Sequence, residues 1–144
     1  VNGVDLYPSK EKCYGKVWTL DKLDDGLKWA DITILCLPLT EQTDGLFDSQ
    51  RFEACKDDMI FVNIARGKIV DTDALIDALL NRKLSFAVLD VFEEEPLSED
   101  SPLWNIENLI ITPHNSFVGN NNNERMWNVI MDNLSVYWRE IDEK

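Results

Sequence analysis

Short apolar runs, separated by polar or helical stretches, constrain the fold of this chain more than any other feature. They are rich in Ile, Val and Leu, and they occupy residues 31–37, 59–64, 86–89 and 109–112. Runs of this length and composition are typical of parallel strands that are buried on both faces. Because strand and helix patterns alternate along the chain, the sequence predicts an α/β fold with a doubly wound parallel sheet.

The helical segments between these runs carry recognisable start signals. Asp71 is the expected N-cap of the clearest helix, and a shorter helix is expected over residues 48–55. Asp21 is a candidate N-cap for a helix with an apolar face. Residues 120–144 open with several Asn candidates for the N-cap and continue with apolar residues four positions apart, which predicts a long amphipathic closing helix.

Charge and cysteine content limit the classes of partner. The chain of 144 residues has a net charge of -13, which argues against a nucleic-acid partner. No apolar run approaches the roughly 20 residues that span a bilayer, so no membrane partner is expected. Its three cysteines form no ligand-like pair, which favours a reduced, cytoplasmic setting and no metal site.

Polar residues follow several of the predicted strands. Pro38, Arg66 and Asp90 come at or just after strand ends, Glu95 follows in the loop after Asp90, and His114 follows the last strand. Parallel strands place their carboxyl ends on one edge of the sheet, where ligands bind in open α/β folds. Residues far apart in sequence are therefore expected to meet there.

Three of these side chains suit proton transfer to a carbonyl group that also receives a hydride. His114, the only histidine, has the imidazole best suited to moving a proton near neutral pH. A Glu95 carboxylate on its second nitrogen would fix the tautomer, and the Arg66 guanidinium would grip a substrate carboxylate. Taken singly, each also has an ordinary structural explanation as a surface or turn residue. The coincidence at the strand ends favours the functional interpretation.

The first residues suggest a nucleotide site. Residues 1–5 form a short strand pattern that ends in Asp5, and an acid at this place in a dinucleotide-binding sheet binds the adenosine ribose. From these five residues alone, a solvated turn beside Pro8 is the better interpretation. The Gly-x-Gly-x-x-Gly loop that belongs about 20 residues earlier is not in the chain, so a partial sheet without its first strand and Gly-rich loop is expected.

Several motifs in order resemble the C-terminal, NAD-binding-domain portion of the D-isomer-specific 2-hydroxyacid dehydrogenases, which implies a Rossmann-type sheet. They cover roughly residues 31 to 126, at the family's spacing. The matching segments are Leu37-Pro38-Leu39-Thr40, Asn63-Ile64-Ala65-Arg66-Gly67, Leu89-Asp90-Val91-Phe92-Glu93-Glu94-Glu95-Pro96-Leu97, Ser101-Pro102-Leu103-Trp104 and Thr112-Pro113-His114.

The resemblance implies a role for each matched position in hydride transfer between NAD(H) and a 2-hydroxy or 2-oxo acid. The implied catalytic residues are Arg66 for the substrate carboxylate, His114 for the proton and Glu95 as the partner of His114. The implied cofactor-binding residues are Asp5, Pro38, Ala65 and Asp90, with Asp5 favouring NAD over NADP. The residues after His114, 115–119, are bulkier than in many relatives, which affects the expected substrate size and the nicotinamide pocket. Because the substrate domain shapes the substrate pocket, the substrate stays open among pyruvate, hydroxypyruvate, glyoxylate and branched 2-oxo acids.

The same resemblance predicts the organisation of the chain. Residues 1–119 are expected to form a partial NAD-binding domain, and residues 120–144 a helix that in the family leads back to a substrate domain absent here. The chain alone is expected to form a homodimer or larger assembly and to be inactive. Two alternatives stay open: a truncated, non-catalytic fragment, and an NAD-sensing binding protein of the same fold.

Overall fold

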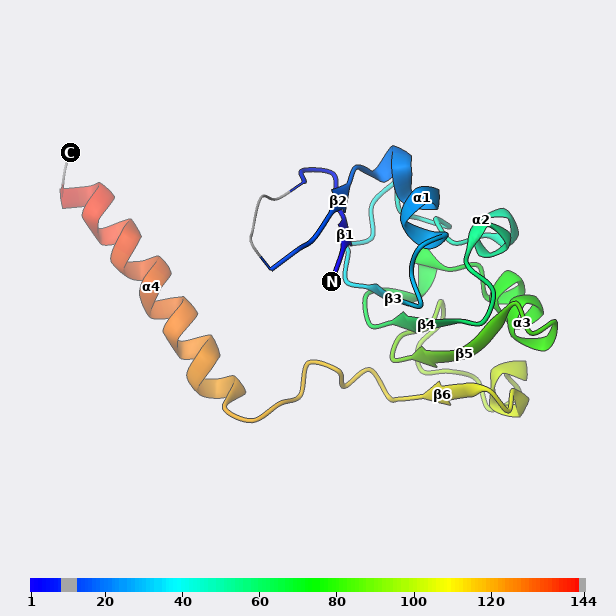
Figure 1. Cartoon of the computed structure of the whole chain (residues 1–144). Helices are drawn as coiled ribbons and strands as arrows, with labels where there is room; N and C mark the ends of the chain where they lie inside the picture. Colours follow the sequence, from blue (N-terminus) through cyan, green and yellow to red (C-terminus); the bar gives the residue numbers. More distant parts are fainter. Residues whose placement is uncertain (9–12, 143–144) are drawn as a thin grey trace. The chain divides into compact units, whose positions relative to one another are not determined.

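The computed structural model describes residues 1–8 and 13–142, and the chain divides into two compact units, Val1–His114 and Asn115–Lys144 (Figure 1). The first unit contains the sheets and all helices but one. Its strands are β1 (Gly3–Val4), β2 (Val17–Trp18), β3 (Ile32–Leu35), β4 (Met59–Asn63), β5 (Leu84–Leu89) and β6 (Leu109–Ile111). Its helices are α1 (Leu23–Leu27), α2 (Ser49–Ala54) and α3 (Thr72–Leu80), with 3-10 turns at Leu20–Lys22, Gly67–Ile69 and Pro102–Asn105.

All strand pairs in the described chain are parallel. Four strands form one sheet in the order β3-β4-β5-β6, and β1 pairs with β2 in a separate two-stranded sheet. The predicted alternation of strand and helix is therefore confirmed. Strands that follow one another in the chain lie side by side in the larger sheet, so their carboxyl ends share one edge.

Helices cover one face of the larger sheet. Phe61 of β4 contacts Phe47 and Phe52, with ring centroids 5.1 and 5.2 Å apart, and Phe52 comes from α2. Leu27 of α1 and Leu79 of α3 belong to the same buried cluster. Aromatic contacts of this kind add to the free energy gained by burying the rings. The core therefore lies between the sheet and these three helices.

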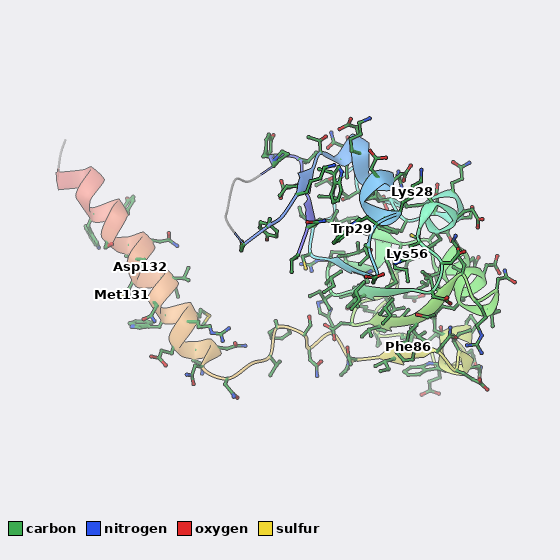
Figure 2. The ribbon with its side chains drawn as sticks, viewed as in Figure 1. Lys28, Trp29, Lys56, Phe86, Met131 and Asp132 are labelled. Carbon is green, nitrogen blue, oxygen red and sulfur yellow. The ribbon has the colours of Figure 1, made fainter. Side chains whose placement is uncertain are left out.

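The opposite face of the sheet is apolar but only partly buried. Ile32 and Ile34 are each 56% exposed and Ile110 is 48% exposed. This face carries Ile32, Ile34, Ile60, Val62, Phe86, Val88 and Ile110, of which Phe86 is labelled in Figure 2. The expectation that these strands are buried on both faces is thus wrong for this unit. An apolar run has the same sequence whether one or both faces are covered, so the pattern does not distinguish the two cases.

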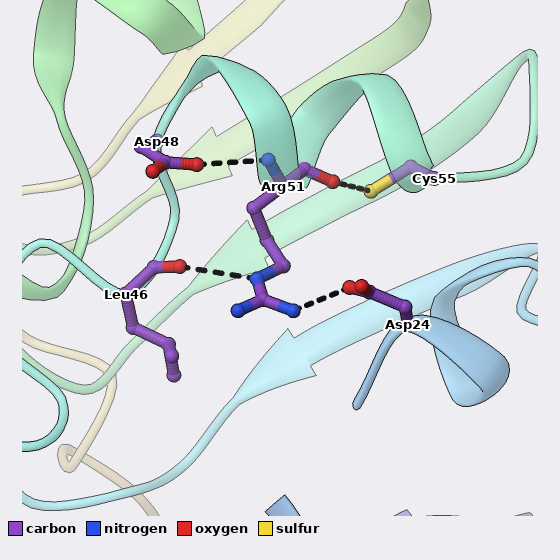
Figure 3. Close-up of polar contacts among 5 residues, drawn as sticks. All are labelled: Asp24, Leu46, Asp48, Arg51 and Cys55. Atoms are coloured by element: carbon purple, nitrogen blue, oxygen red, sulfur yellow. Dashed lines mark hydrogen bonds and ion pairs between the residues drawn. The ribbon is translucent and has the colours of Figure 1, made fainter. Parts of the chain in front are cut away.

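Helix α2 is held at both ends by side-chain contacts (Figure 3). Asp48 is its N-cap and accepts a hydrogen bond from the Arg51 N–H at 2.8 Å. The Arg51 guanidinium forms an ion pair with Asp24 of α1 and donates to the Leu46 carbonyl at 3.4 Å. At the other end the Cys55 thiol donates to the Arg51 carbonyl at 3.3 Å. Arg51 therefore connects α2 to α1.

The expected caps are right in one case and wrong in another. Asp71 is the N-cap of α3 and accepts from the Ala74 N–H at 3.0 Å, as predicted. Asp21 lies inside the 3-10 turn Leu20–Lys22, and Lys22 occupies the N-cap position of α1 without a side-chain hydrogen bond. The 3-10 turn starts the helical path one turn earlier, so Asp21 has no N-cap geometry.

The second unit contains α4 (Asn122–Asp142), which agrees with the predicted closing helix. Its described apolar side chains are exposed: Trp138 is 59% exposed, and Met131, which is labelled in Figure 2, is 47% exposed. Within the described residues, no helix is both long enough and apolar enough to cross a bilayer.

Candidate active site

The turn that carries Arg66 is fixed by the side chain of Asn63. Asn63 ends β4 and is 1% exposed; its Nδ2 donates to the Arg66 carbonyl at 3.0 Å, and its Oδ1 accepts from the Ala65 N–H at 3.0 Å. A buried amide with both groups satisfied is a stable way to hold a backbone turn. The Arg66 side chain is exposed, with one N–H donated to the Ala65 carbonyl at 2.6 Å.

Gly67 lets the loop after β5 approach Arg66 closely. A Cβ atom at Gly67 would lie 1.8 Å from the carbonyl carbon of Phe92 and 2.0 Å from its oxygen. No side chain fits in that space, so only glycine permits the contact. The loop that leads to Glu95 therefore packs against the residue that follows Arg66.

Glu95 and His114 form a direct pair. The Nδ1 atom of His114 lies 2.7 Å from Oε2 of Glu95, and the other carboxylate oxygen accepts from the Phe92 N–H at 3.0 Å. The two side chains are partly exposed, at 42% for His114 and 36% for Glu95. Since Nδ1 is engaged, Nε2 is the ring nitrogen left to exchange a proton with a ligand.

The electrostatics of the pair favour an ionised carboxylate. The hydrogen bond from His114 lowers the pKa of Glu95 most, followed by the hydrogen bond from the Phe92 N–H. Burial opposes these two hydrogen bonds with a smaller effect, and the positive charges of His114 and Arg66 lower the pKa by less still. Arg66 is therefore close enough to act on Glu95 through its charge, and the structure brings these three predicted residues together.

The backbone at His114 is in the left-handed region, with φ of 50°. The His114 N–H donates to the Thr112 carbonyl at 3.1 Å, across Pro113, which makes a tight turn directly after β6. A non-glycine residue in this conformation costs about 1–2 kcal/mol, so the surrounding contacts must maintain it. Such strain at a titratable residue is typical of a functional site.

Asp90 lies at the end of β5 and is 1% exposed. Its N–H donates to the Asn63 carbonyl at 3.0 Å, and its Oδ1 accepts from the Thr112 hydroxyl at 2.5 Å. Asp90 therefore connects the turns that carry Arg66 and His114.

The remaining predicted residues are Ala65, beside Arg66 after β4, and two residues that follow other strands. Ala65 is buried in the Arg66 turn, and Pro38 follows β3, where its carbonyl accepts from the Thr43 hydroxyl at 2.8 Å. Asp5 directly follows β1, and its Oδ1 accepts from the Tyr7 N–H at 2.8 Å. Asp5 thus belongs to the two-stranded sheet and not to the four strands that carry the other candidates.

Sequence reasoning gave no role to two residues that organise this site. Asn63 belongs to a matched motif but has no predicted role of its own, although a lone amide in an otherwise apolar strand is a detectable signal. Glu93 accepts hydrogen bonds from the Thr72 N–H at 3.0 Å and hydroxyl at 2.5 Å. That contact joins positions 21 residues apart, and a run of three glutamates gives no indication of which one makes it.

Comparison with known protein families decides the assignment. Residues 1–116 match the family model described as "D-isomer specific 2-hydroxyacid dehydrogenase, NAD binding domain". The chain belongs to this family. The Rossmann-type fold expected for a member is confirmed by the neighbouring structures below, and the family consists of oxidoreductases.

Among the curated members of the family, glyoxylate/hydroxypyruvate reductase B of Salmonella newport is 44% identical over 115 residues. That match covers 78% of this chain and 35% of the reductase. The chain thus spans about a third of the length of the curated relatives it matches.

Solved structures of the family superpose on most of the chain. A D-isomer specific 2-hydroxyacid dehydrogenase family protein from Aeromonas salmonicida is 40% identical, with a TM-score of 0.82. The match covers 99% of this chain and 44% of the Aeromonas chain. A probable 2-hydroxyacid dehydrogenase from Rhizobium etli, solved in complex with NADP, is 32% identical with a TM-score of 0.82, and covers 96% and 44%. A Xanthobacter autotrophicus member, solved with NADPH, is 36% identical with a TM-score of 0.78, and covers 83% and 50%.

Proposed function

We propose that this chain supplies the cofactor-binding and proton-transfer residues of an NAD-dependent D-2-hydroxyacid dehydrogenase. The observation that carries the proposal is the 2.7 Å contact between His114 Nδ1 and Glu95 Oε2, with the Arg66 charge close enough to act on the same carboxylate. A histidine, an acid and an arginine in this arrangement suit the interconversion of a 2-oxo and a 2-hydroxy acid.

Each residue has a distinct part in this reaction. Arg66 binds the substrate carboxylate with the N–H groups that it does not donate to Ala65. His114 gives the proton on Nε2 to the carbonyl oxygen during reduction and takes it back during oxidation. Glu95 holds the imidazole in one tautomer and orientation through Nδ1.

The residues at the strand ends fit a nicotinamide dinucleotide, which when bound supplies or accepts the hydride. Asp90 is a fully buried acid at the end of β5, beside the turns of Arg66 and His114, a position suited to the carboxamide end of the cofactor. Pro38 and Ala65 would line it through the backbone. Asp5, at the end of β1, would accept hydrogen bonds from the ribose hydroxyls and repel a 2′-phosphate, so NAD is preferred.

The preferred cofactor is tested by comparing kcat/KM with NADH and NADPH. These kinetic tests use the active protein, meaning a protein in which this chain is joined to its substrate domain. The Xanthobacter autotrophicus and Rhizobium etli neighbours were solved with NADPH and NADP, so a preference for NADH would distinguish this chain from those relatives. We expect NADH to be favoured at least tenfold. Equal values with the two cofactors would show that Asp5 does not bind the ribose.

Glyoxylate and hydroxypyruvate are the first substrates to assay. This choice is supported by the name of the 44% identical reductase. Loss of NADH absorbance with either acid, abolished by His114→Ala, is the expected result. An active protein that reduces neither would move the substrate to another 2-oxo acid.

Residues 1–119 are proposed as a partial NAD-binding domain, and residues 120–144 as the helix that leads to a substrate domain. The chain contains no Gly-x-Gly-x-x-Gly sequence to hold a pyrophosphate, so we expect weak or absent NADH binding and no turnover by the chain alone. We also expect a homodimer or larger assembly. Three free cysteines support a reduced, cytoplasmic setting.

Light scattering combined with an NADH titration of the same sample tests these expectations. A monomer that binds NADH at micromolar levels and reduces a 2-oxo acid would contradict them. NADH binding without turnover, in a protein with all its domains, would favour the alternative of an NAD-sensing protein.

A further inference from the structure

The loop that carries Glu95 is fastened to the start of helix α3. The carboxylate of Glu93 accepts two hydrogen bonds from Thr72, from its N–H at 3.0 Å and from its hydroxyl at 2.5 Å. The first N–H groups of a helix have no acceptor within the helix, and that end is electropositive. Asp71 already satisfies the Ala74 N–H, so Glu93 is the second acid at this helix end.

The same loop is held next to Arg66 by the contact at Gly67. The space for a Cβ atom there is filled by the Phe92 carbonyl group, and the Glu93 nitrogen lies 2.3 Å from the same point. The Phe92 N–H then donates to Oε1 of Glu95, which leaves Oε2 for His114. The backbone of residues 92 and 93 is therefore the direct mechanical connection between α3, the Arg66 turn and the Glu95–His114 pair.

We propose that Glu93 is a positioning residue for the Glu95–His114 pair: by fastening the loop to α3, it keeps Oε2 of Glu95 within hydrogen-bond distance of the imidazole. Its consequence for catalysis rests on the proposed function above. Its consequence for geometry does not, because the position of the imidazole can be observed without any substrate.

Glu94 provides a matched control in the same loop. It has the same side chain and is exposed like Glu93. Among the described residues, Glu94 takes part in no hydrogen bond or ion pair, whereas Glu93 and Glu95 each accept two. Removing the Glu94 carboxylate therefore changes the charge of the loop equally and leaves its attachment intact.

The test uses the imidazole signal of the chain labelled at histidine. Because the sequence contains one histidine, its NMR spectrum has a single imidazole to follow at fixed pH. We expect Glu93→Ala to move this signal toward its position in Glu95→Gln, which breaks the pair directly. Glu94→Ala should leave it in place, and Glu93→Gln, which keeps an acceptor oxygen, should restore most of the native position.

Circular dichroism identifies variants that fail to fold. If Glu93→Ala is unfolded, Thr72→Val replaces it, because this change removes the hydroxyl donor and retains the backbone N–H. A folded variant of either kind whose imidazole signal coincides with the native one overturns the proposal.

Kinetics of the active protein separate this proposal from the proposed function. A positioning role predicts that Glu93→Ala lowers kcat by about tenfold or less with KM nearly unchanged, since Arg66 still binds the carboxylate. Equal kcat for Glu93→Ala and Glu94→Ala in an active enzyme overturns the positioning role and leaves the proposed function standing. If the imidazole signal shifts but a protein with all its domains reduces no 2-oxo acid, the positioning role is upheld and the proposed function is overturned.

Discussion

Arg66 presents its guanidinium to solvent from the turn that directly follows β4. The Asn63 side chain holds this turn through two hydrogen bonds to its backbone, so the arginine does not depend on an acidic partner for its position. The exposed N–H groups remain available for an anionic ligand.

Replacement of Arg66 by lysine should therefore affect substrate binding and leave the fold intact. An ammonium keeps the charge but loses the planar fork, and a charge-assisted hydrogen bond is worth about 1.5–3 kcal/mol, so kcat/KM should fall at least about tenfold. Steady-state kinetics of the active protein measure this loss. Arg82→Lys, at an exposed arginine after α3, is the control and should have native kinetics.

The Glu95–His114 pair gives the protein a specific response to acid. Because the pKa of Glu95 is lowered in the folded state, its contribution to stability is present above the ordinary value of 4.5 and is lost as pH falls through the lowered value. Denaturant unfolding should show Glu95→Gln less stable than the native protein at pH 6. The difference should shrink as pH falls below 4.5, and a constant difference would mean that the carboxylate contributes no charge-dependent stability.

Cys55 should be the unreactive thiol of the three. Burial, opposed by the Lys83 charge, raises its pKa from 9.0 to about 12, so at pH 8 it is protonated in the folded protein. Cys13 and Cys36 are exposed. A thiol reagent should therefore label two groups rapidly in the native protein and the third only after denaturation. Between pH 9 and 12 the thiol of Cys55 ionises in the unfolded chain but not in the folded protein. The free energy of unfolding should therefore decline as pH rises through this range.

At the scale of elements, local signals were sufficient where a cap or an apolar run determines the structure. The cap Asp71 and the four strands of the larger sheet were predictable for this reason. The start of α1 was not, because a 3-10 turn precedes it and shifts the cap position. The contacts of Glu93 and Gly67 join segments more than 20 residues apart, so no local pattern encodes them.

The glycines at positions 67 and 26 predict opposite effects of the same substitution. Gly67→Ala places a methyl group within the Phe92 carbonyl, and the loop must move at a cost of about 1–3 kcal/mol. A Cβ atom at Gly26, inside α1, would lie 3.4 Å from Cγ2 of Val4, which is an ordinary contact. Gly26→Ala should therefore stabilise the fold by up to about 1 kcal/mol. Chemical denaturation of both variants measures the pair. Equal destabilisation of the two variants would show that the space around each glycine does not determine the effect of the alanine substitution.

For the molecule as a whole, the main feature is a parallel sheet with helices packed on one face and an apolar, partly exposed face opposite. The neighbouring residues Ile34 and Leu35 of β3 lie on these two faces, at 56% and 4% exposure. The open side thus has the composition of a protein interior, although solvent reaches it.

Lysine substitutions at these two neighbours measure how open that face is. Ile34→Lys should cost about 1 kcal/mol or less and lower the fluorescence of a dye that binds apolar surface, whereas Leu35→Lys should cost about 3 kcal/mol or more. Urea unfolding gives both values. Comparable losses would mean that the face is covered in solution.

The partly open sheet face and the net charge of -13 act on self-association in opposite directions. Repulsion between acidic surfaces extends over a Debye length, about 30 Å at 0.01 M salt but about 8 Å at 0.15 M, while the attraction between apolar faces is not screened. We therefore expect ionic strength, and not protein concentration alone, to control self-association of the molecule. Dilute buffer should keep the molecules dispersed, and added salt should allow the apolar faces to approach one another.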